Sequence, residues 1–348
     1  MAELKSFPSL KKPPNNTLRK WKWRMRGAAM TAADELFDSM EATDSAPFDV
    51  LFVSTFLNLA EFRGLAPRQI AGLPAIVYFH ENQLVYPNRS TAEWDFQFPL
   101  TNITSALSAD ACLFNSQWNL DRFCDKIPGF LRQFPDHHPR NVAERIRAKS
   151  AVVPPPFDPR VFDSMQPHRG TRCRIVWPHR WEHDKNPDEF FLAVGALAEE
   201  GHDFEVVVAG QSFAETRNLI VDAANALGDR LVQVGEPATR EEYARLLSDC
   251  DVAVSTARNE FFGLAMVEAC YAGALPLVPD RLAYRELYPR EWRYVGVDQL
   301  IARLRAAIVE RPAPGQACAF ASEFRFEQLA HRYELALRTV AAGGAVTG

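Results

Sequence analysis

The sequence predicts an α/β protein with two domains, each built on a parallel sheet that is covered by helices on both faces. The chain has 348 residues, which is more than one hydrophobic core usually organises. Short apolar runs alternate with helical patterns in both halves, as expected for buried parallel strands. A proline-rich stretch at 150–159 separates the halves, since clustered prolines exclude helix and stiffen a connection.

The first half holds three continuous apolar runs that predict parallel strands. These are Val50–Ser54, Ala75–Phe79 and Ala111–Asn115. Helical patterns connect them at Ala28–Met40, Leu100–Ala109 and Trp118–Lys126. We expect this first domain to occupy residues 1–155.

The second half repeats the alternation over residues 156–320. Strands are predicted at Arg174–Trp177, Phe204–Ala209, Leu231–Val234, Asp251–Ser255 and Leu275–Val278. Helices are predicted at Pro187–Glu200, Ala214–Leu227, Arg240–Asp249 and Ala265–Ala272. A final amphipathic helix, Phe326–Val340, falls within residues 321–341, and a small-residue tail follows at 342–348.

Charge is unevenly distributed along the chain. The net charge is −5 and the pI about 6.0, so a basic field over the whole protein, of the kind that binds nucleic acid, is excluded. Eight Lys and Arg residues nevertheless stand in the first 26 residues beside a single acid, Glu3. Trp21 and Trp23 alternate with Lys20, Lys22 and Arg24 within this cluster, which suits phosphates and a stacked base. A solvated arm is the alternative interpretation.

The six cysteines have no metal-ligand spacing, and several lie in apolar runs, as buried free thiols do. The sequence has no secretory signal and no apolar run of membrane-spanning length. We therefore expect a reduced, cytoplasmic protein without stable membrane insertion. Contact with lipid through a surface helix stays open.

The segment around Glu260 is the strongest functional signal. A short strand, an acidic glycine loop and a buried helix follow one another, with Glu260 in the loop and Glu268 in the helix. The helix N-terminus after Phe262, Gly263 and Leu264 presents backbone N–H groups to a phosphate. The two carboxylates can accept hydrogen bonds from sugar hydroxyls. Solvated surface residues are the alternative, but Glu268 lies among apolar neighbours and needs a partner.

This segment resembles the E-x7-E signature of family 4 retaining glycosyltransferases, which have the GT-B architecture of two Rossmann-like domains around an interdomain cleft. The stretch from Arg180 to Lys185 is similar to the family's diphosphate-binding segment. His80 and Gly210, like Arg180 and Glu260, directly follow predicted strands, and such loops form ligand sites. The resemblance also implies that the last helix packs back on the first domain.

Two further blocks resemble one subgroup, the tRNA-queuosine mannosyltransferases. They are Tyr78–Pro87 and Lys20–Gly27. Three shorter stretches fit the same pattern: Asp95–Phe98, Phe114–Asn119 and Pro135–Pro139. The resemblance implies transfer of mannose from GDP-mannose, with retention at the anomeric carbon, to queuosine in a tRNA anticodon loop.

The resemblance also assigns roles to individual residues. The catalytic set is Glu260, His80, Arg180 and Lys185. The donor-binding set is Arg180, Lys185, Gly210, Phe262, Gly263, Leu264 and Glu268, and the acceptor-binding set is Trp21, Trp23, Arg24, Glu81 and Asn82. We expect no cofactor and no metal site, because no Asp-x-Asp motif is assignable and protein cations can balance the diphosphate.

The chain departs from the subgroup at its start. Members usually open with a strand, a glycine-rich turn with a histidine, and a helix, whereas residues 1–16 are polar and proline-rich. We therefore expect the first domain to lack its first βα unit. Two other functions stay open: the same fold acting on a small-molecule or polysaccharide acceptor, and a non-catalytic nucleotide- or tRNA-binding protein.

Overall fold

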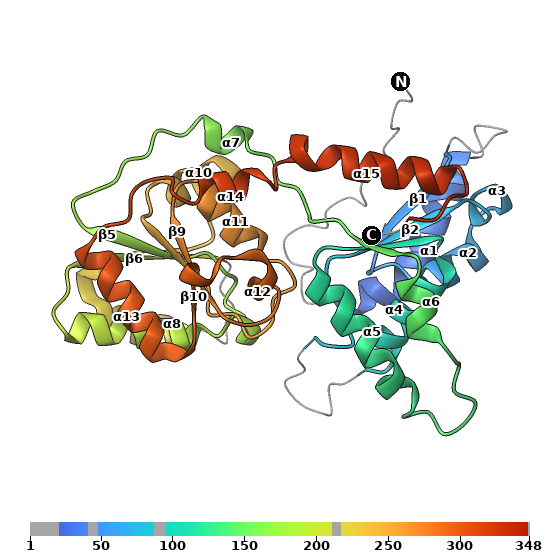
Figure 1. Cartoon of the computed structure of the whole chain (residues 1–348), viewed down its shortest axis with the longest axis horizontal. Coiled ribbons are helices and arrows are strands. Elements are labelled where there is room, and N and C mark those ends of the chain that lie inside the picture. The colour runs from blue at the N-terminus through green and yellow to red at the C-terminus, as the bar shows by residue number, and fades with distance from the viewer. Residues whose placement is uncertain (1–20, 41–47, 87–94, 211–216, 347–348) are drawn as a thin grey trace. The chain divides into compact units, whose positions relative to one another are not determined.

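The structure is a computed structural model that describes residues 21–40, 48–86, 95–210 and 217–346 (Figure 1). The chain divides into two compact units. The first unit contains Met1–Val153 and Arg332–Gly348, and the second contains Pro154–His331. The division falls inside the proline-rich stretch, at the first of its prolines, which have no N–H group for a regular hydrogen bond.

The first unit is built on a parallel sheet in the order β1-β2-β3-β4. Its strands are β1 (Leu51–Ser54), β2 (Ala75–Phe79), β3 (Ala111–Phe114) and β4 (Ser150–Val152). Its helices are α1 (Trp21–Met40), α2 (Leu59–Leu65), α3 (Arg68–Ala71), α4 (Gln97–Ser108), α5 (Gln117–Leu131) and α6 (Val142–Arg147). The three predicted strands are confirmed, with ends within one residue of the predicted ones.

Both faces of this sheet are covered, which explains why its strands are apolar throughout. Val77 and Phe79 point into the larger core with Phe114. Ile76 and Tyr78 point to the opposite face, where they pack with residues of the second half of α15 (Phe326–Ala341). Figure 1 shows this end of α15 lying along the sheet.

The second unit has a six-stranded sheet in the order β10-β9-β8-β5-β6-β7, with all neighbours parallel. The strands are β5 (Cys173–Trp177), β6 (Phe204–Ala209), β7 (Leu231–Gly235), β8 (Val252–Val254), β9 (Leu275–Pro279) and β10 (Arg293–Tyr294). The helices are α7 (Arg160–Asp163), α8 (Pro187–Glu199), α9 (Arg217–Leu227), α10 (Arg240–Ser248), α11 (Leu264–Tyr271), α12 (Tyr284–Leu287), α13 (Gly296–Val309) and α14 (Cys318–Ser322). Single 3₁₀ turns lie at His183–Lys185, Gly228–Arg230 and Arg290–Trp292. All five predicted strands are confirmed, whereas the strand β10 and the helices α7, α12, α13 and α14 were not predicted.

A fully buried carboxylate fixes the start of β8. Asp251 accepts hydrogen bonds from Nε and Nη2 of Arg311 at 2.9 and 2.8 Å and from the Arg174 backbone N–H at 2.8 Å. Arg169 completes the cluster at 3.4 Å. Because a buried charge is costly unless paired, this cluster anchors segments far apart in sequence around the central strands.

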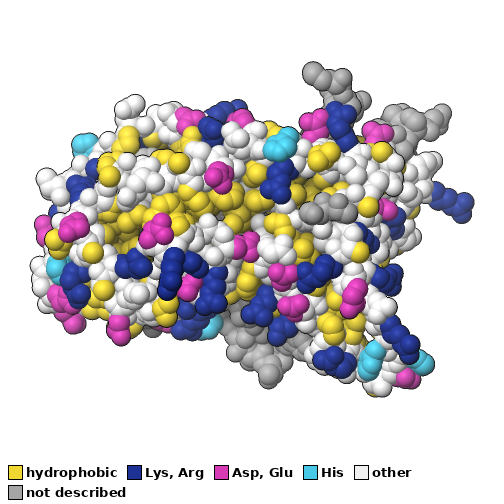
Figure 2. Space-filling model, viewed as in Figure 1, with side chains coloured by type: hydrophobic (Ala, Val, Ile, Leu, Met, Phe, Trp, Pro, Cys, Tyr) yellow, Lys and Arg dark blue, Asp and Glu magenta, His cyan; other side chains and the backbone are white. Residues whose placement is uncertain are grey.

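The surface carries charges of both signs. On the face in Figure 2, Lys and Arg side chains are interspersed with Asp and Glu, in keeping with the net charge of −5. Across the part of the chain that the structure describes, every helix is too short or too polar to cross a membrane.

Candidate active site

Three neighbouring strands of the second unit carry most of the predicted donor-site residues. The loop after β5 holds Arg180 and Lys185, the loop after β8 holds Glu260, and Gly210 directly follows β6. Because β8, β5 and β6 are adjacent and parallel, these loops emerge at one edge of the sheet. The chain order reverses between β5 and β8, and such a switch point is where open α/β sheets bind ligands.

Lys185 is the centre of this group. Its ammonium donates to the Asn259 carbonyl at 3.0 Å and to Oε2 of Glu260 at 3.2 Å, and it lies 3.3 Å from Oδ2 of Asp184. Burial lowers the pKa of Lys185, but Glu260 and Asp184 raise it more, so its net pKa is above the ordinary value. Lys185 therefore stays charged and holds the Glu260 loop.

Glu260 is held at both carboxylate oxygens. While Oε2 meets Lys185, Oε1 accepts the backbone N–H groups of Phe261 at 3.1 Å and Phe262 at 3.4 Å. Burial alone raises the pKa of Glu260, but Lys185 and these hydrogen bonds lower it below its ordinary value. Glu260 is thus an ionised acceptor in a fixed position, with lone pairs left for a hydroxyl group.

Further hydrogen bonds join the β5 loop to the β8 loop. The Asp184 carbonyl accepts the N–H groups of Arg258 at 2.7 Å and Asn259 at 3.2 Å. The Thr256 hydroxyl donates to the Lys185 carbonyl at 2.8 Å and accepts from the Trp177 indole at 3.0 Å. The two loops form one hydrogen-bonded body, which limits their movement.

Two glycines permit close backbone approaches in this site. A Cβ on Gly210 would lie 2.0 Å from the carbonyl oxygen of His179, so the β6 end can approach the β5 loop only without a side chain. Gly263 has a φ of +89°, and a Cβ there would meet the Tyr284 ring at 2.8 Å. Gly263 precedes α11, which begins at Leu264 and whose first N–H groups have no partner within the helix.

Glu268, the second glutamate of the motif, lies on α11 and is almost fully buried. Its carboxylate pairs with the guanidinium of Arg240, with a distance of 3.3 Å between Nη1 and Oε2. The same guanidinium lies over the rings of Phe162 and Tyr243. Arg240 is thus the partner that a buried Glu268 required. Sequence reasoning placed Arg240 only at the start of a helix, because contacts 28 residues apart leave no local pattern.

Arg180 differs from Lys185 in its environment. Its side chain is 57% exposed and pairs at 3.3 Å with Glu182, as a surface pair does. The Arg180 guanidinium therefore remains accessible to an anionic ligand, whereas the charge of Lys185 is directed to buried carboxylates.

His179 is a site residue that sequence reasoning missed. Its ring is buried, Nε2 has no hydrogen-bond partner among the described residues, and burial followed by the charge of Lys185 lowers its pKa to about 3. His179 is therefore neutral beside Lys185 and Glu260. Its position directly before Arg180 was the one available signal, and a single histidine after a strand is usually structural.

The first unit holds His80 at the end of β2. Its ring stacks on Phe56 with 5.3 Å between ring centroids, and burial lowers its pKa. The His80 carbonyl accepts the side-chain amide of Asn115 at 2.7 Å. Glu81 is half-buried and accepts the amide of Gln83 at 3.1 Å.

Asn82 is fully buried and occupied by internal hydrogen bonds. Its amide donates to Asn119 at 2.7 Å, and its oxygen accepts the N–H groups of Leu84 and Val85 at 3.1 and 3.2 Å. Asn119 in turn donates to Asn115 at 2.8 Å and to the Phe79 carbonyl at 3.0 Å. The structure thus gives Asn82 a supporting role in the His80 loop, in contrast to the direct acceptor contact predicted for it.

Trp21, Trp23 and Arg24 lie on α1, and their side chains are outside the described residues. Within the same block, Arg26 forms an ion pair with Asp95 and lies over the Phe98 ring. Two of the blocks that resemble the subgroup are therefore in contact within the first unit.

Comparison with known proteins agrees with this arrangement. Residues 13–157 match the family model described as tRNA-queuosine alpha-mannosyltransferase N-terminal, and residues 163–288 match glycosyl transferases group 1. The tRNA-queuosine alpha-mannosyltransferase of Drosophila melanogaster is 38% identical over 298 residues, which are 82% of this chain and 76% of that protein. The chain belongs to the tRNA-queuosine alpha-mannosyltransferase family. It is a glycosyltransferase.

More distant similarities support the same fold. A GDP-mannose-dependent alpha-(1-6)-phosphatidylinositol dimannoside mannosyltransferase of Mycobacterium tuberculosis is 29% identical over 42% of this chain and 40% of its own length. The crystal structure of Anabaena HepE with UDP and glucose has a TM-score of 0.63 at 14% identity, covering 90% of this chain and 81% of that one. Sucrose-phosphate synthase from Thermosynechococcus elongatus has a TM-score of 0.68 at 15% identity, covering 94% and 80%. This member of the family thus has the predicted GT-B architecture.

Lys185→Met tests whether the buried pair holds the second unit together. The substitution leaves the Glu260 carboxylate buried without its cation, so we expect the free energy of unfolding to fall by about 3–5 kcal/mol at pH 7. In the wild type the pKa of Glu260 is below its ordinary 4.5. The stabilisation is therefore present above pH 4.5 and is lost as the pH falls through the folded-state pKa.

In Lys185→Met, burial without the lysine charge raises the pKa of Glu260. As the pH falls, Glu260 is therefore protonated, and its protonation removes the unpaired buried charge that destabilises the variant. Denaturant unfolding at pH 7 and pH 4 should show a smaller difference from the wild type at pH 4. The double variant Lys185→Met/Glu260→Gln serves as the control and should recover part of the loss at pH 7. An equal difference at both pH values would contradict the ionic role of the pair.

Proposed function

We propose that this glycosyltransferase moves mannose from GDP-mannose to queuosine in the anticodon loop of a tRNA, with retention at the anomeric carbon. The observation that carries the proposal is the ionised, immobilised Glu260 directly before the N-terminus of α11. That arrangement suits a ligand with both hydroxyl groups and phosphates. The name of the Drosophila relative supports the acceptor, and the two relatives described above are both mannosyltransferases.

On this proposal, the second unit binds the donor. The first N–H groups of α11, with the backbone at Phe262, Gly263 and Leu264, and the exposed guanidinium of Arg180 stabilise the diphosphate as the glycosidic bond breaks. Glu260 accepts a hydroxyl of the transferred sugar. Lys185 supports this contact with the sugar hydroxyl indirectly, because it fixes Glu260. Gly210 lets the β6 end approach the site.

Glu268 accepts hydroxyls of the donor ribose in this scheme, oriented by Arg240. Paired carboxylate oxygens keep unused lone pairs, so binding does not require the ion pair to break.

The first unit provides the acceptor side. We propose that His80, neutral through burial, aligns the acceptor or a sugar hydroxyl, with Glu81 beside it. Trp21, Trp23 and Arg24 are proposed to contact the tRNA by stacking and charge. We also propose a cytoplasmic location, which agrees with the six free cysteines.

The acceptor is tested by a transfer assay with radiolabelled GDP-mannose and total tRNA from cells able and unable to make queuosine. We expect label only in the queuosine-containing tRNA, because the acceptor hydroxyl belongs to that base. Label in neither tRNA would overturn the tRNA proposal, and label in both would overturn queuosine as the acceptor.

Glu260→Ala and Glu268→Ala should affect different steps. Loss of Glu260 should lower kcat by about 10²–10³-fold, the size measured for a preorganised electrostatic contact in other enzymes. Glu268→Ala should mainly raise the apparent Kd of GDP-mannose, measured by calorimetry. Glu310→Ala, an exposed glutamate at the end of α13, is the control and should behave like the wild type. Undiminished turnover in Glu260→Ala would refute its assignment.

We propose further that transfer needs no divalent metal, since Arg180 and the α11 N-terminus supply positive charge for the diphosphate. The rate of mannose transfer should be the same in excess EDTA and in Mg²⁺. A rate abolished by EDTA and restored by Mg²⁺ would contradict this.

A further inference from the structure

The hairpin formed by α5, α6 and the loop between them is a basic region in an acidic protein. Residues 117–147 contain six Lys and Arg against four Asp and Glu, which gives a net charge of +2, whereas the whole chain carries −5. His137 and His138 add two further potential cations in the exposed loop. At the lower right of Figure 2, where Figure 1 places this loop, Lys, Arg and His side chains gather at the surface.

Several of these cations are available to a partner. Arg147 pairs with Asp121 at 2.5 Å, so its charge is used within the hairpin. Five others are exposed and make no ion pair with any residue that the structure describes: Arg122, Lys126, Arg132, Arg140 and Arg145. Uncompensated cations of this kind are the groups that bind phosphates and release counterions.

The cations form an extended surface. Arg122 and Lys126 are four residues apart, so they project from one face of α5. Arg132 follows ten residues after Arg122, which corresponds to about 15 Å along a helix. A small anion would engage only one end of such a surface, so a polyanion is the better fit.

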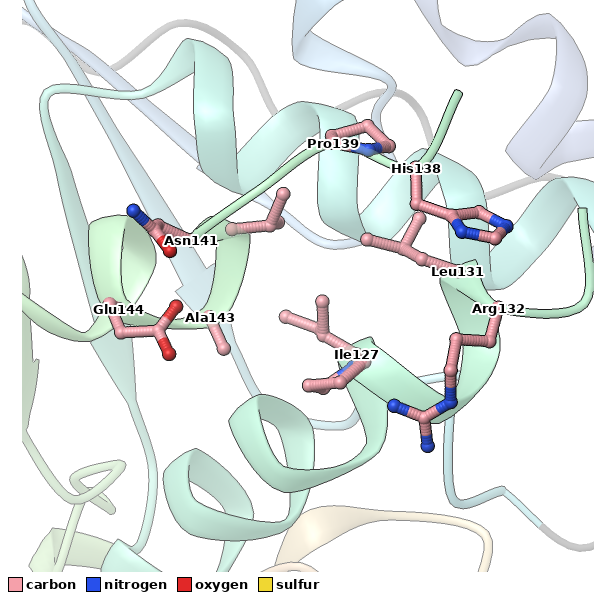
Figure 3. A pocket seen from close by; sticks show the side chains of 10 residues that line it. Ile127, Leu131, Arg132, His138, Pro139, Asn141, Ala143 and Glu144 are labelled. Atoms are coloured by element: carbon pink, nitrogen blue, oxygen red, sulfur yellow. The ribbon is translucent and has the colours of Figure 1, made fainter. Parts of the chain in front are cut away.

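A pocket of about 230 Å³ lies between α5 and α6 in the same hairpin. Figure 3 shows Ile127 and Leu131 pointing toward its middle, with Arg132 and His138 at one end and Glu144 at the other. An apolar floor with a cation at the rim suits the face of a base and the phosphate beside it. An acidic peptide would satisfy the cations but would need an aromatic residue at one particular position to cover the floor, whereas every nucleotide carries a flat base beside its phosphate.

The hairpin is also joined to the loop that carries His80. Asn119, in the first turn of α5, donates to the Phe79 carbonyl at 3.0 Å and accepts from Asn82 at 2.7 Å. The N-terminus of α5 therefore lies beside the His80 loop, and its cations lead away from that loop toward Arg132. A nucleic acid held on α5 would pass close to the proposed acceptor site.

We propose that the α5–α6 hairpin binds the tRNA acceptor, with Arg122, Lys126, Arg132 and Arg140 neutralising backbone phosphates and the pocket receiving one unstacked nucleotide. This inference rests on the proposed function, because that function supplies the tRNA. It adds a surface on which the polyanion is held, apart from the residues that contact the reacting sugar.

The role of the exposed cations in tRNA binding is tested with the double variant Arg132→Glu/Arg140→Glu. Filter binding of labelled queuosine-containing tRNA, over a range of KCl concentrations, should give a Kd at least about tenfold higher than that of the wild type at low salt. The negative slope of log K against log salt should become shallower by about 1.4, as expected for two lost single-strand phosphate contacts. The matched control is Arg68→Glu/Arg290→Glu, which makes the same change of charge at two exposed arginines on other elements. Equal weakening in the control, or none in the test variant, would overturn the proposal.

The pocket is tested separately with Ala143→Trp, which fills it without changing charge. We expect a severalfold higher Kd for tRNA with the salt slope unchanged, and unaltered affinity would remove the pocket from the binding surface. Thermal unfolding of each variant checks that the fold is retained.

GDP-mannose binding, measured by calorimetry, should be unchanged in all of these variants. The two proposals fail in different ways. Tight tRNA binding without mannose transfer in the wild type would overturn the proposed function and leave the surface standing. Mannose transfer to tRNA that is insensitive to these substitutions would overturn the surface alone.

Discussion

The geometry of the second unit depends on one buried ammonium group. Lys185 bridges the 3₁₀ turn His183–Lys185 and the loop after β8 by meeting the Asn259 carbonyl and the carboxylates of Glu260 and Asp184. Each of these groups would be costly to bury alone, and together they compensate one another. Without the ammonium, the carboxylates would repel each other and the loop before α11 would lose its anchor. The lysine thus fixes Glu260, and Glu260 in turn fixes the backbone at Phe261 and Phe262.

This use of Lys185 changes how the charge of a diphosphate has to be balanced. The resemblance to family 4 assigns the diphosphate to Arg180 and Lys185 together, but the lysine charge is already engaged by carboxylates. The neutral state of His179 adds no positive charge, since burial keeps its pKa at about 3. Among the described groups near Glu260, Arg180, which is more than half exposed, and the first N–H groups of α11 remain available to meet phosphate oxygens.

The sequence was informative where structure is local and less so where it is not. Continuous apolar runs located most strands of both sheets, because a parallel strand buried on both faces needs apolar side chains at every position. The strands β4 and β10 have only three and two residues, and neither was predicted from such a run. In the proposed site, the spacing of Glu260 and Glu268 singled out the β8 loop and α11. Their partners Lys185 and Arg240 come from other elements, and only the fold brings these pairs together. Asn82 shows a second limit of the sequence. An asparagine beside a histidine resembles a ligand-binding residue in sequence, but in the structure its side chain is buried and supports the His80 loop.

The two units hold their site loops by different chemistry, and the difference suits their proposed substrates. In the second unit, ionic groups fix the loops that would meet a charged donor. In the first unit, neutral amides of Asn82, Asn115 and Asn119 hold the His80 loop, so no fixed charge of this network competes with the tRNA phosphates. A polyanion still requires cations, and α5 can supply them without placing them at His80. Asn119 in its first turn supports the His80 loop, while Arg122 and Lys126 lie further along the same helix. One rigid element would then set the distance between the bound phosphates and the reacting nucleoside, which a flexible basic arm could not do.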